Sequence, residues 1–424
     1  MTTASLTSSK LTIKVAELSR LPVIHVSIPV LDEESLLYRT LECLENQSYS
    51  DIKVYICVNQ PDEWWQDPEK RSICLRNQKS LATLNRGLPF DHVIIDRSSP
   101  GYGWKGKHHG VGWARKTIMD TIDRHASSED IIVSLDADTV FDKDYLLSVA
   151  ISFINHPDFI AMSVPYFHRL TDDPNLNRII LRYEIYMRYY LLNMMRIGSP
   201  YAFTAMGSAI ALRLKAYRAI GGITPKKSGE DFYFLQKLSK YGKVMCWNDE
   251  KVYPEARFSD RVFYGTGPAL IRGNAGDWSG YPIFPYHLFD DIWETSELFP
   301  SLYSANIDTP VSRFLSGICK EDDPWQPLRE NFNMVTQFVR ACNEKLDGLR
   351  ILQYLKSQNT EDMRIDESNL MDYLSTFYPP EEIRNLNIDW ETFSFMASPL
   401  EQVEQIRMYL FGKEEESRFI ATLL

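Results

Sequence analysis

The chain has 424 residues, a net charge of −11, 44% apolar residues and 24% charged residues. This length exceeds what one core usually holds, so we expect two domains. The acidic balance argues against nucleic acid as a partner and against a broadly basic membrane face.

The six cysteines and eight histidines show no zinc or disulfide spacing. Residues 1–10 have no apolar signal core, and no window offers eighteen uncharged apolar residues. We therefore expect a location in a reducing cytoplasm, with association at the inner face of the membrane left open.

Strand-like and helix-like segments alternate through the first half of the chain, and this predicts a mostly parallel sheet flanked by helices. Ligands bind beyond the carboxyl ends of such strands, where Asp32, Asn59, Asp96 and Asp136 are expected. The expected strands are 23–30, 52–58, 92–95, 131–135 and 159–164, and the expected helices are 32–47 (capped by Asp32), 112–125 and 145–155.

Two acids follow the fourth of these strands, Asp136 and Asp138. Side chains at positions i and i+2 of a strand point to the same side, so the two carboxylates can converge. A hard cation such as Mg²⁺ or Mn²⁺ would fit between them, sharing its remaining sites with phosphate oxygens. The alternative is an acidic turn that caps the next helix.

Two glycine-rich basic stretches could bind an anion. Residues 101–116 hold five glycines with Lys105, Lys107, Arg115 and Lys116 before a helix, and a mobile surface loop is the alternative. In the second stretch, Arg257 and Arg261 precede Gly265 and Gly267. The two arginines could bind a diphosphate, or they could be ion-paired surface arginines.

Glu230 and Asp231 open a helix-like segment that runs to Tyr241. They are either acids favoured by the helix dipole or a general base, with Asp231 as the base and Glu230 orienting it. Upstream, the small residues of 205–211 either let a ligand approach the backbone or pack tightly.

Residues 177–195 predict a long amphipathic helix, which is usually core, with a membrane-surface or partner role as the alternative. Helical periodicity dominates from about residue 328, with breaks at 378–380 and 398–399, and 321–324 is a candidate linker. The expected organisation is a polar tail (1–21), an α/β domain (22–284) and a mainly helical C-terminal extension (285–424).

The order of these motifs resembles that of the family 2 glycosyltransferases, which have the GT-A fold. The resemblance covers about residues 22–270. It rests on Ile28–Glu33, Gly110–Lys116, Leu135–Asp138 as a DxD motif, the segment from Gly207-Ser208 to Gly221-Gly222, and Gly229–Asp231 as an E-D base motif.

The resemblance implies a hexosyltransferase-like enzyme that moves a sugar from a UDP- or GDP-sugar to a saccharide or other hydroxyl acceptor with Mg²⁺ or Mn²⁺. Asp138 and Asp136 are then expected at the metal, and Asp231, with Glu230, at the acceptor proton, which implies inversion at the anomeric carbon. The nucleotide sugar is expected at Pro29, Asp32, Glu33, Asn59, Lys107, Arg115, Asp136, Ala137, Arg257 and Arg261, and the acceptor at Gly207 and Ser208.

Two departures from the family pattern stand out. Asn59 replaces an aspartate that usually helps to bind the nucleobase, and 252–255 lacks the histidine that often ligates the metal, where Glu255 is a candidate substitute. A non-catalytic nucleotide- or carbohydrate-binding scaffold and a sugar-phosphate nucleotidyltransferase stay open as alternatives, as does a homodimer built on the C-terminal helices.

Overall fold

The computed structural model describes residues 21–261, 265–360, 363 and 365–423. The chain forms two compact units. The sheet unit comprises residues 1–171 and 203–271, and the helical unit comprises 172–202 and 272–424. The predicted tail lies, up to residue 20, outside the described residues.

The sheet unit is built on a seven-stranded sheet with the order β3-β2-β1-β4-β7-β6-β8. All neighbouring pairs are parallel except those of β7, which runs antiparallel to both β4 and β6. The strands are β1 (Ile24–Val30), β2 (Ile52–Asn59), β3 (His92–Arg97), β4 (Ile131–Ser134), β6 (Phe159–Ser163), β7 (Ile210–Arg213) and β8 (Lys243–Met245).

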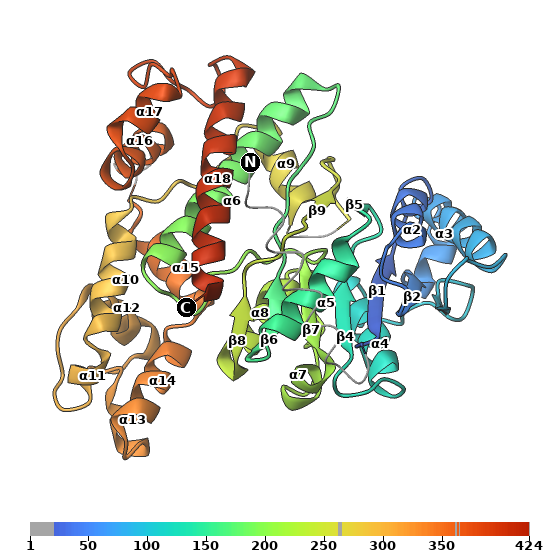
Figure 1. Cartoon of the computed structure of the whole chain (residues 1–424), viewed down its shortest axis with the longest axis horizontal. Helices are drawn as coiled ribbons and strands as arrows, with labels where there is room; N and C mark the ends of the chain where they lie inside the picture. The colour runs from blue at the N-terminus through green and yellow to red at the C-terminus, as the bar shows by residue number, and fades with distance from the viewer. Residues whose placement is uncertain (1–20, 262–264, 361–362, 364, 424) are drawn as a thin grey trace. The chain divides into compact units, whose positions relative to one another are not determined.

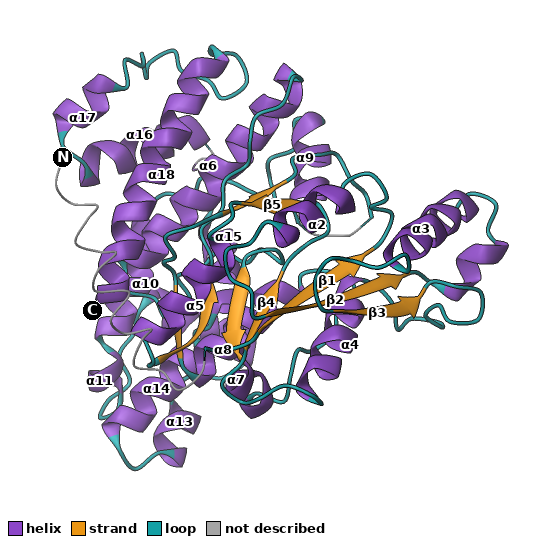
Figure 2. Ribbon diagram, turned by 45° about the vertical axis from the view of Figure 1, so that its right-hand side comes forward, coloured by secondary structure: helices purple, strands orange, loops and turns teal. Residues whose placement is uncertain are grey.

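Helices cover both faces of this sheet, and Figure 2 shows α3 and α4 on opposite sides of β1, β2 and β3. Every residue of β1 and β4 is buried, as expected for central parallel strands that are covered twice. The flanking elements are α2 (Leu37–Glu45), a 3₁₀ turn (Asp62–Gln66), α3 (Arg71–Leu84), α4 (Val111–Asp123), α5 (Tyr145–Asn155), α7 (Leu214–Ala219) and α8 (Glu230–Tyr241).

A second, two-stranded sheet pairs β5 (Thr139–Phe141) with β9 (Val252–Pro254) in antiparallel fashion. Thr139 lies opposite Pro254, so the residues before β5 face the residues after β9. This pairing was not predicted from the sequence, and it brings the segment that carries Arg257 to the DxD-like motif.

The helical unit contains α6 (Pro174–Arg196), which packs along α18 (Leu400–Leu423), and Figure 1 shows the two helices side by side. Asp173 caps α6 by accepting from the backbone N–H groups of Asn175 and Leu176. The other helices are α10 (His287–Glu297), α11 (Phe299–Leu302), α12 (Pro310–Cys319), α13 (Gln326–Asn331), α14 (Val335–Lys345), α15 (Gly348–Gln358), α16 (Asp366–Phe377) and α17 (Pro380–Asn385), while α9 (Thr266–Asn274) spans residue 271, where the sheet unit ends.

The predicted fold class, a mostly parallel GT-A-type sheet flanked by helices and followed by a helical C-terminal extension, is confirmed. The predicted boundary at residue 284 stays a prediction. The compact units add a feature that the sequence did not indicate: 172–202 packs with the C-terminal helices rather than with the sheet. In the part of the chain that the structure describes, no helix is long and apolar enough to cross a membrane.

Three local expectations are settled. The stripe on α6 is mainly core, since Ile180, Tyr183 and Met194 are buried and Met187 and Tyr190 are half-buried. The prediction that Asp32 caps α2 is wrong, because the helix starts at Leu37 and Asp32 pairs with Arg76 instead. The prediction of a linker at 321–324 is wrong as well, because this segment joins α12 to α13 within one unit.

Candidate active site

The chain leaves β1 through a strained turn. Asp32 has a φ of 60°, which is uncommon for a residue with a side chain. Its backbone N–H donates to Asn77 Oδ1 at 2.9 Å, and its carboxylate accepts from Arg76 Nε at 2.5 Å. These contacts hold the turn and direct Glu33 back over the strand ends.

Polar side chains at the end of β2 are already engaged with each other. The amide of Asn59 donates to the Val30 carbonyl at 2.9 Å and accepts from the Trp104 indole at 3.1 Å. Asn77 donates to Gln60 Oε1 at 2.8 Å. Asn59 therefore uses both ends of its amide within the protein, and its predicted role at the nucleobase stays a prediction.

A buried arginine joins the two acidic motifs. Arg115 lies on the inner face of α4 with its side chain 4% exposed, and it donates through Nη1 to Glu230 and through Nη2 to Asp136. Gly207 lies directly against this guanidinium. Two acids almost 100 residues apart in sequence thus share one cation.

Asp231 follows Glu230 at the start of α8, after Gly229 in a left-handed conformation. It accepts from the N–H of Phe232 at 2.8 Å and, in the described part of the chain, forms no ion pair. Burial raises the pKa of Asp231 above its ordinary value, and the charge of Arg115 opposes this rise. Burial likewise raises the pKa of Glu230, to about 7, against the opposing charge of Arg115. Both carboxyls are therefore better proton acceptors than a solvated acid.

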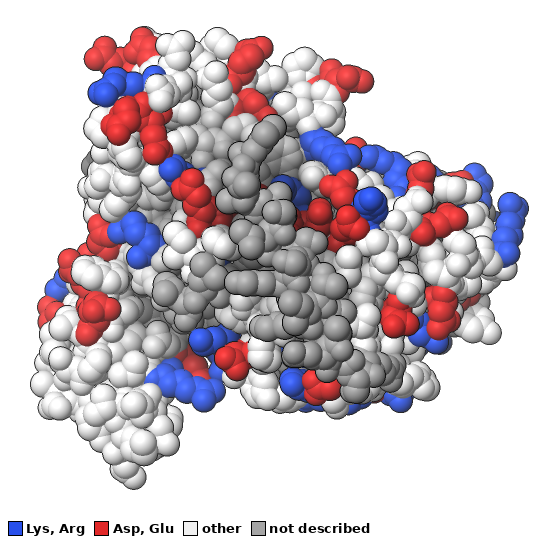
Figure 3. Space-filling view, viewed as in Figure 1, with Lys and Arg blue, Asp and Glu red and all other residues white. Residues whose placement is uncertain are grey.

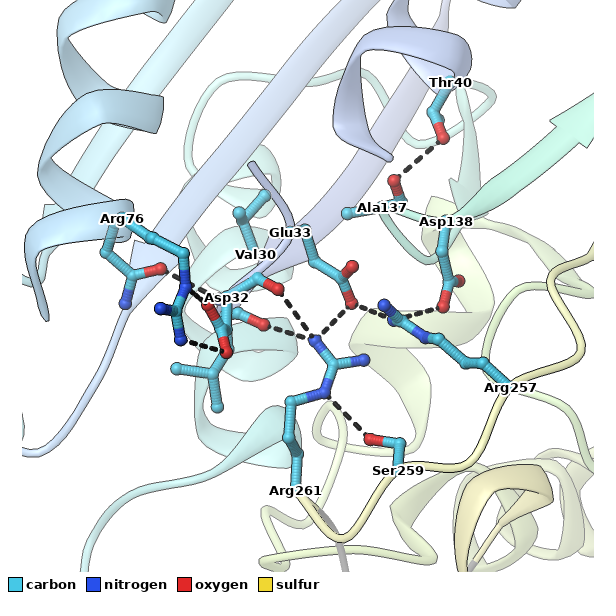
Figure 4. A network of polar contacts seen from close by, with 12 residues as sticks. Val30, Asp32, Glu33, Thr40, Arg76, Ala137, Asp138, Arg257, Ser259 and Arg261 are labelled. Atoms are coloured by element: carbon cyan, nitrogen blue, oxygen red, sulfur yellow. Dashed lines mark hydrogen bonds and ion pairs between the residues drawn. The ribbon is translucent and has the colours of Figure 1, made fainter. Parts of the chain in front are cut away.

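Asp138 faces a second group of cations. Its Oδ2 accepts from Arg257 Nη2 at 2.6 Å, and the same nitrogen also donates to Glu33. Glu33 accepts in addition from Arg261 Nη1 at 2.5 Å. Figure 4 shows the two arginines reaching the ends of β1 and β4 from the segment after β9.

Burial raises the pKa of Asp138 to about 7, and the negative charge of Glu33 adds to this effect. Arg257 opposes the rise. The charge of Asp136 also raises the pKa of Asp138, Glu230 and Asp231, so the four carboxyls share one electrostatic environment. Like charges gathered in this way favour a cation or a proton between them.

The remaining predicted site residues occupy varied positions. Pro29 is buried within β1 opposite Cys57, and the carbonyl of Ala137 accepts from Thr40 Oγ1 at 3.0 Å. Ser208 is fully buried, and its hydroxyl has no hydrogen-bond partner in the described residues. Lys107 is exposed in the loop before α4. The ligand roles predicted for these residues remain predictions.

Two features of the site were missed in the sequence. Arg76 on α3 pairs with Asp32, and no motif or spacing pointed to it. The second feature is Arg39, which donates through Nη1 to Glu255, the candidate metal ligand, at 2.8 Å. Within the described residues, no group of three or more His, Cys, Asp or Glu side chains is arranged to hold a metal ion.

The fold and the site define an α/β protein with carboxylates and arginines gathered at the carboxyl ends of its strands. Residues 131–271 match the family described as Glycosyl transferase family group 2. The match spans the DxD-like motif, the small-residue segment, the E-D motif and both arginines of the second basic stretch. It confirms, over residues 131–271, the resemblance to the family 2 glycosyltransferases that was stated from the sequence.

No curated protein matches the chain significantly. Among solved structures, S. aureus TarS 1–349 is similar with 13% identity, covering 79% of this chain and 92% of that one, at a TM-score of 0.38. The mannosyltransferase PcManGT from Pyrobaculum calidifontis, in complex with GDP-Man and Mn²⁺, shows 14% identity, covering 99% and 94%, at a TM-score of 0.36. Similarities this low carry no argument about function, which depends on the residues of the chain itself.

Proposed function

We propose that the protein transfers a sugar from a nucleoside diphosphate sugar, UDP- or GDP-linked, to a hydroxyl acceptor with inversion at the anomeric carbon. The observation that carries this proposal is that the sheet unit contains two distinct acidic centres. Asp231 is a partly buried carboxylate that forms no ion pair with the described residues, while Asp138 and Glu33 lie among arginines suited to a diphosphate.

The reaction follows from this division. Asp231 accepts the proton of the acceptor hydroxyl as the acceptor oxygen forms a bond to the anomeric carbon. The bond between that carbon and the diphosphate oxygen breaks, and the diphosphate leaves with the electron pair. Arg257 and Arg261 stabilise the charge that develops on the leaving group. Attack from the side opposite the leaving group inverts the configuration.

A divalent cation fits the donors that are present. Mg²⁺ is usually held by one or two carboxylates together with substrate phosphates, and Asp138 is such a carboxylate, with Asp136 two residues away. When bound, the cation would neutralise charge on the diphosphate and so assist its departure. The buried Oε2 of Glu33, which has no hydrogen-bond partner in the described residues, is a further oxygen at this place.

The test begins with nucleotide sugars screened by thermal shift, because ligands that bind only the folded state raise its apparent stability. Release of UDP or GDP is then followed over a panel of acceptors. Asp231→Asn should reduce transfer by about 10²–10⁴-fold, because a proton acceptor is lost. Asp158→Asn, the same change at an exposed position before β6, should leave the rate unchanged.

Full activity of Asp231→Asn with a verified acceptor would contradict the base assignment. A product that keeps the anomeric configuration of the donor, measured by NMR, would contradict inversion. Nucleotide binding without hydrolysis or transfer over any acceptor would favour the non-catalytic scaffold.

A further inference from the structure

One guanidinium nitrogen joins the buried carboxylate of Glu33 to the half-buried carboxylate of Asp138 at the end of the sheet. Arg257 Nη2 is 2.6 Å from Asp138 Oδ2 and also donates to Glu33 Oε1. The side chains of Glu33 and Asp138 are 8% and 17% exposed, so water screens their mutual repulsion only weakly. Figure 4 shows the guanidinium of Arg257 between these two side chains.

Only one of the two carboxylate oxygens of Glu33 has partners in the described residues. Its Oε1 accepts from both Arg257 and Arg261, whereas its buried Oε2 has no hydrogen-bond partner in the described residues. A buried acceptor that is left unsatisfied costs free energy. It therefore indicates that a further cationic partner belongs at this place.

We infer that Glu33 and Asp138 form a two-carboxylate site for a divalent cation, and that Arg257 fills the position of this cation when no nucleotide is bound. The cation and the guanidinium of Arg257 then exclude each other, because both need the same carboxylate oxygens. The inference rests on the proposed function in one respect: the diphosphate of the nucleotide supplies the remaining ligands of the cation.

The number of protein ligands explains why the exchange depends on the nucleotide. Two carboxylates do not complete the coordination of Mg²⁺ or Mn²⁺, and the described residues offer no third one. A diphosphate supplies oxygens to the cation and also offers Arg257 a new anionic partner, to which a guanidinium binds bidentately. The nucleotide thus supplies the missing ligands of the cation and a new anionic partner for Arg257. Cation binding is therefore coupled to nucleotide binding.

Segment 255–261 has the freedom that such an exchange needs. It follows β9 without regular secondary structure, and Arg257 is 26% exposed. Within the described residues Nη1 and Nε of Arg257 have no hydrogen-bond partner, so these donors remain for a ligand. Arg261 is tied to the backbone carbonyls of Leu31 and Asp32 and anchors the segment while Arg257 moves.

The experiment measures Mn²⁺ binding to the full chain without nucleotide, from the EPR signal of free Mn²⁺. Wild-type protein should bind Mn²⁺ weakly, and Arg257→Gln should bind it about tenfold more tightly or better, within the range usual for coupled ligands. Arg257→Lys keeps the positive charge but loses the planar guanidinium with its several donors. Its affinity for Mn²⁺ should lie between those of wild type and Arg257→Gln. Arg218→Gln, the same change at a surface arginine of α7 that pairs with Asp123, should behave as wild type.

Two double variants locate the site. Adding Glu33→Gln or Asp138→Asn to Arg257→Gln should remove the gained Mn²⁺ affinity. The inference is overturned if neither Arg257 variant binds Mn²⁺ more tightly than wild type, or if the gain survives Glu33→Gln. Because no sugar or acceptor is present, loss of the proposed transferase activity and failure of the exchange are separate outcomes.

Discussion

At the scale of single residues, Arg115 holds the site together. Its guanidinium is the shared partner of Asp136, which follows β4, and of Glu230, which opens α8. A planar guanidinium with several donors suits this bridge, whereas a lysine ammonium would act as a point charge. Arg115 was predicted to bind the nucleotide sugar; the structure shows it buried behind the acids, so we expect it to position Asp136 and Glu230.

Replacing Arg115 by Met should therefore destabilise the sheet unit strongly. Breaking a buried ion pair by removing one partner costs about 3–5 kcal/mol, because the remaining charge is left uncompensated. The loss should be greatest at about pH 8, where Glu230 is mostly ionised given its pKa of about 7. Denaturant unfolding of the purified variant measures it.

The matched control is Lys116→Met, one residue along α4. Lys116 pairs with Asp120 at the surface, and such pairs contribute about 0–1 kcal/mol. The double variant Arg115→Met/Glu230→Gln should lose less stability than Arg115→Met alone, because no buried charge is then left unpaired. Equal losses in the single and double variants would contradict this account.

At the scale of elements, the ends of two helices meet at the site. The first turn of α4 lies against the backbone of the loop before α8, and a Cβ at Gly112 would lie 2.3 Å from the carbonyl oxygen of Lys226. Gly110, just before α4, has a φ of 108° and lies against Lys227. Glycine is thus required where these two elements approach, and this contact sets the distance from Arg115 to Glu230.

Gly112→Ala should consequently destabilise the protein by about 1–3 kcal/mol, because overpacking against backbone cannot be relieved by a rotamer change. Gly412→Ala in α18 is the matched control, since a Cβ there meets nothing within 4 Å. That change should stabilise the helix by about 0.5–1 kcal/mol. Thermal unfolding of the two variants beside wild type should give shifts of opposite sign, and shifts of the same sign would refute the packing argument.

At the scale of the whole molecule, charged side chains occur both on the surface and in buried networks. Acidic and basic side chains are interspersed on the face that Figure 3 shows. In the helical unit, Glu184 and Glu414 on α6 and α18 are buried with Arg188, Arg407 and Arg418 in one ion-pair network. Buried ionisable groups of this kind make the stability of the molecule depend on pH.

His25 in β1 gives a pH dependence of known sign. Burial lowers the pKa of His25 from its ordinary value of 6.5, despite its contact with Asp130 at 3.2 Å. A proton on Nδ1 would have no acceptor in the described residues. The unfolded chain thus binds this proton more readily, so the contribution of His25 to stability is complete above about pH 6.5 and falls as pH is lowered.

Glu230 and Asp138, whose pKa values are raised to about 7, stabilise the folded state as pH falls and oppose the effect of His25. We therefore expect the contribution of His25 in the difference between the two chains: as pH falls below about 6.5, the midpoint of thermal unfolding of wild type should decrease relative to that of His25→Gln. His125→Gln, at an exposed position after α4, should leave the profile unchanged. A difference between wild type and His25→Gln that stays constant over this range would show that His25 does not titrate as argued.

The sequence by itself determined the alternation of strands and helices, because hydrophobic periodicity and strand length are local properties. It predicted β2, α4, α5 and α6 to within a few residues. It also indicated Asp136, Asp138, Glu230 and Asp231 as candidate site residues, whose roles stay predictions. Short strands such as β5 and β9 escaped prediction, because three residues carry little periodic signal.

Only the tertiary structure decided which charges meet. Arg115 joins Asp136 to Glu230 because α4 and α8 approach through glycine, and Arg257 reaches Glu33 and Asp138 because β9 pairs with β5. No spacing along the chain encodes such contacts, and those of Arg115 with Glu230 and of Arg257 with Glu33 and Asp138 join residues more than 100 positions apart. They depend on strand pairing and helix packing, which the folded chain settles as a whole.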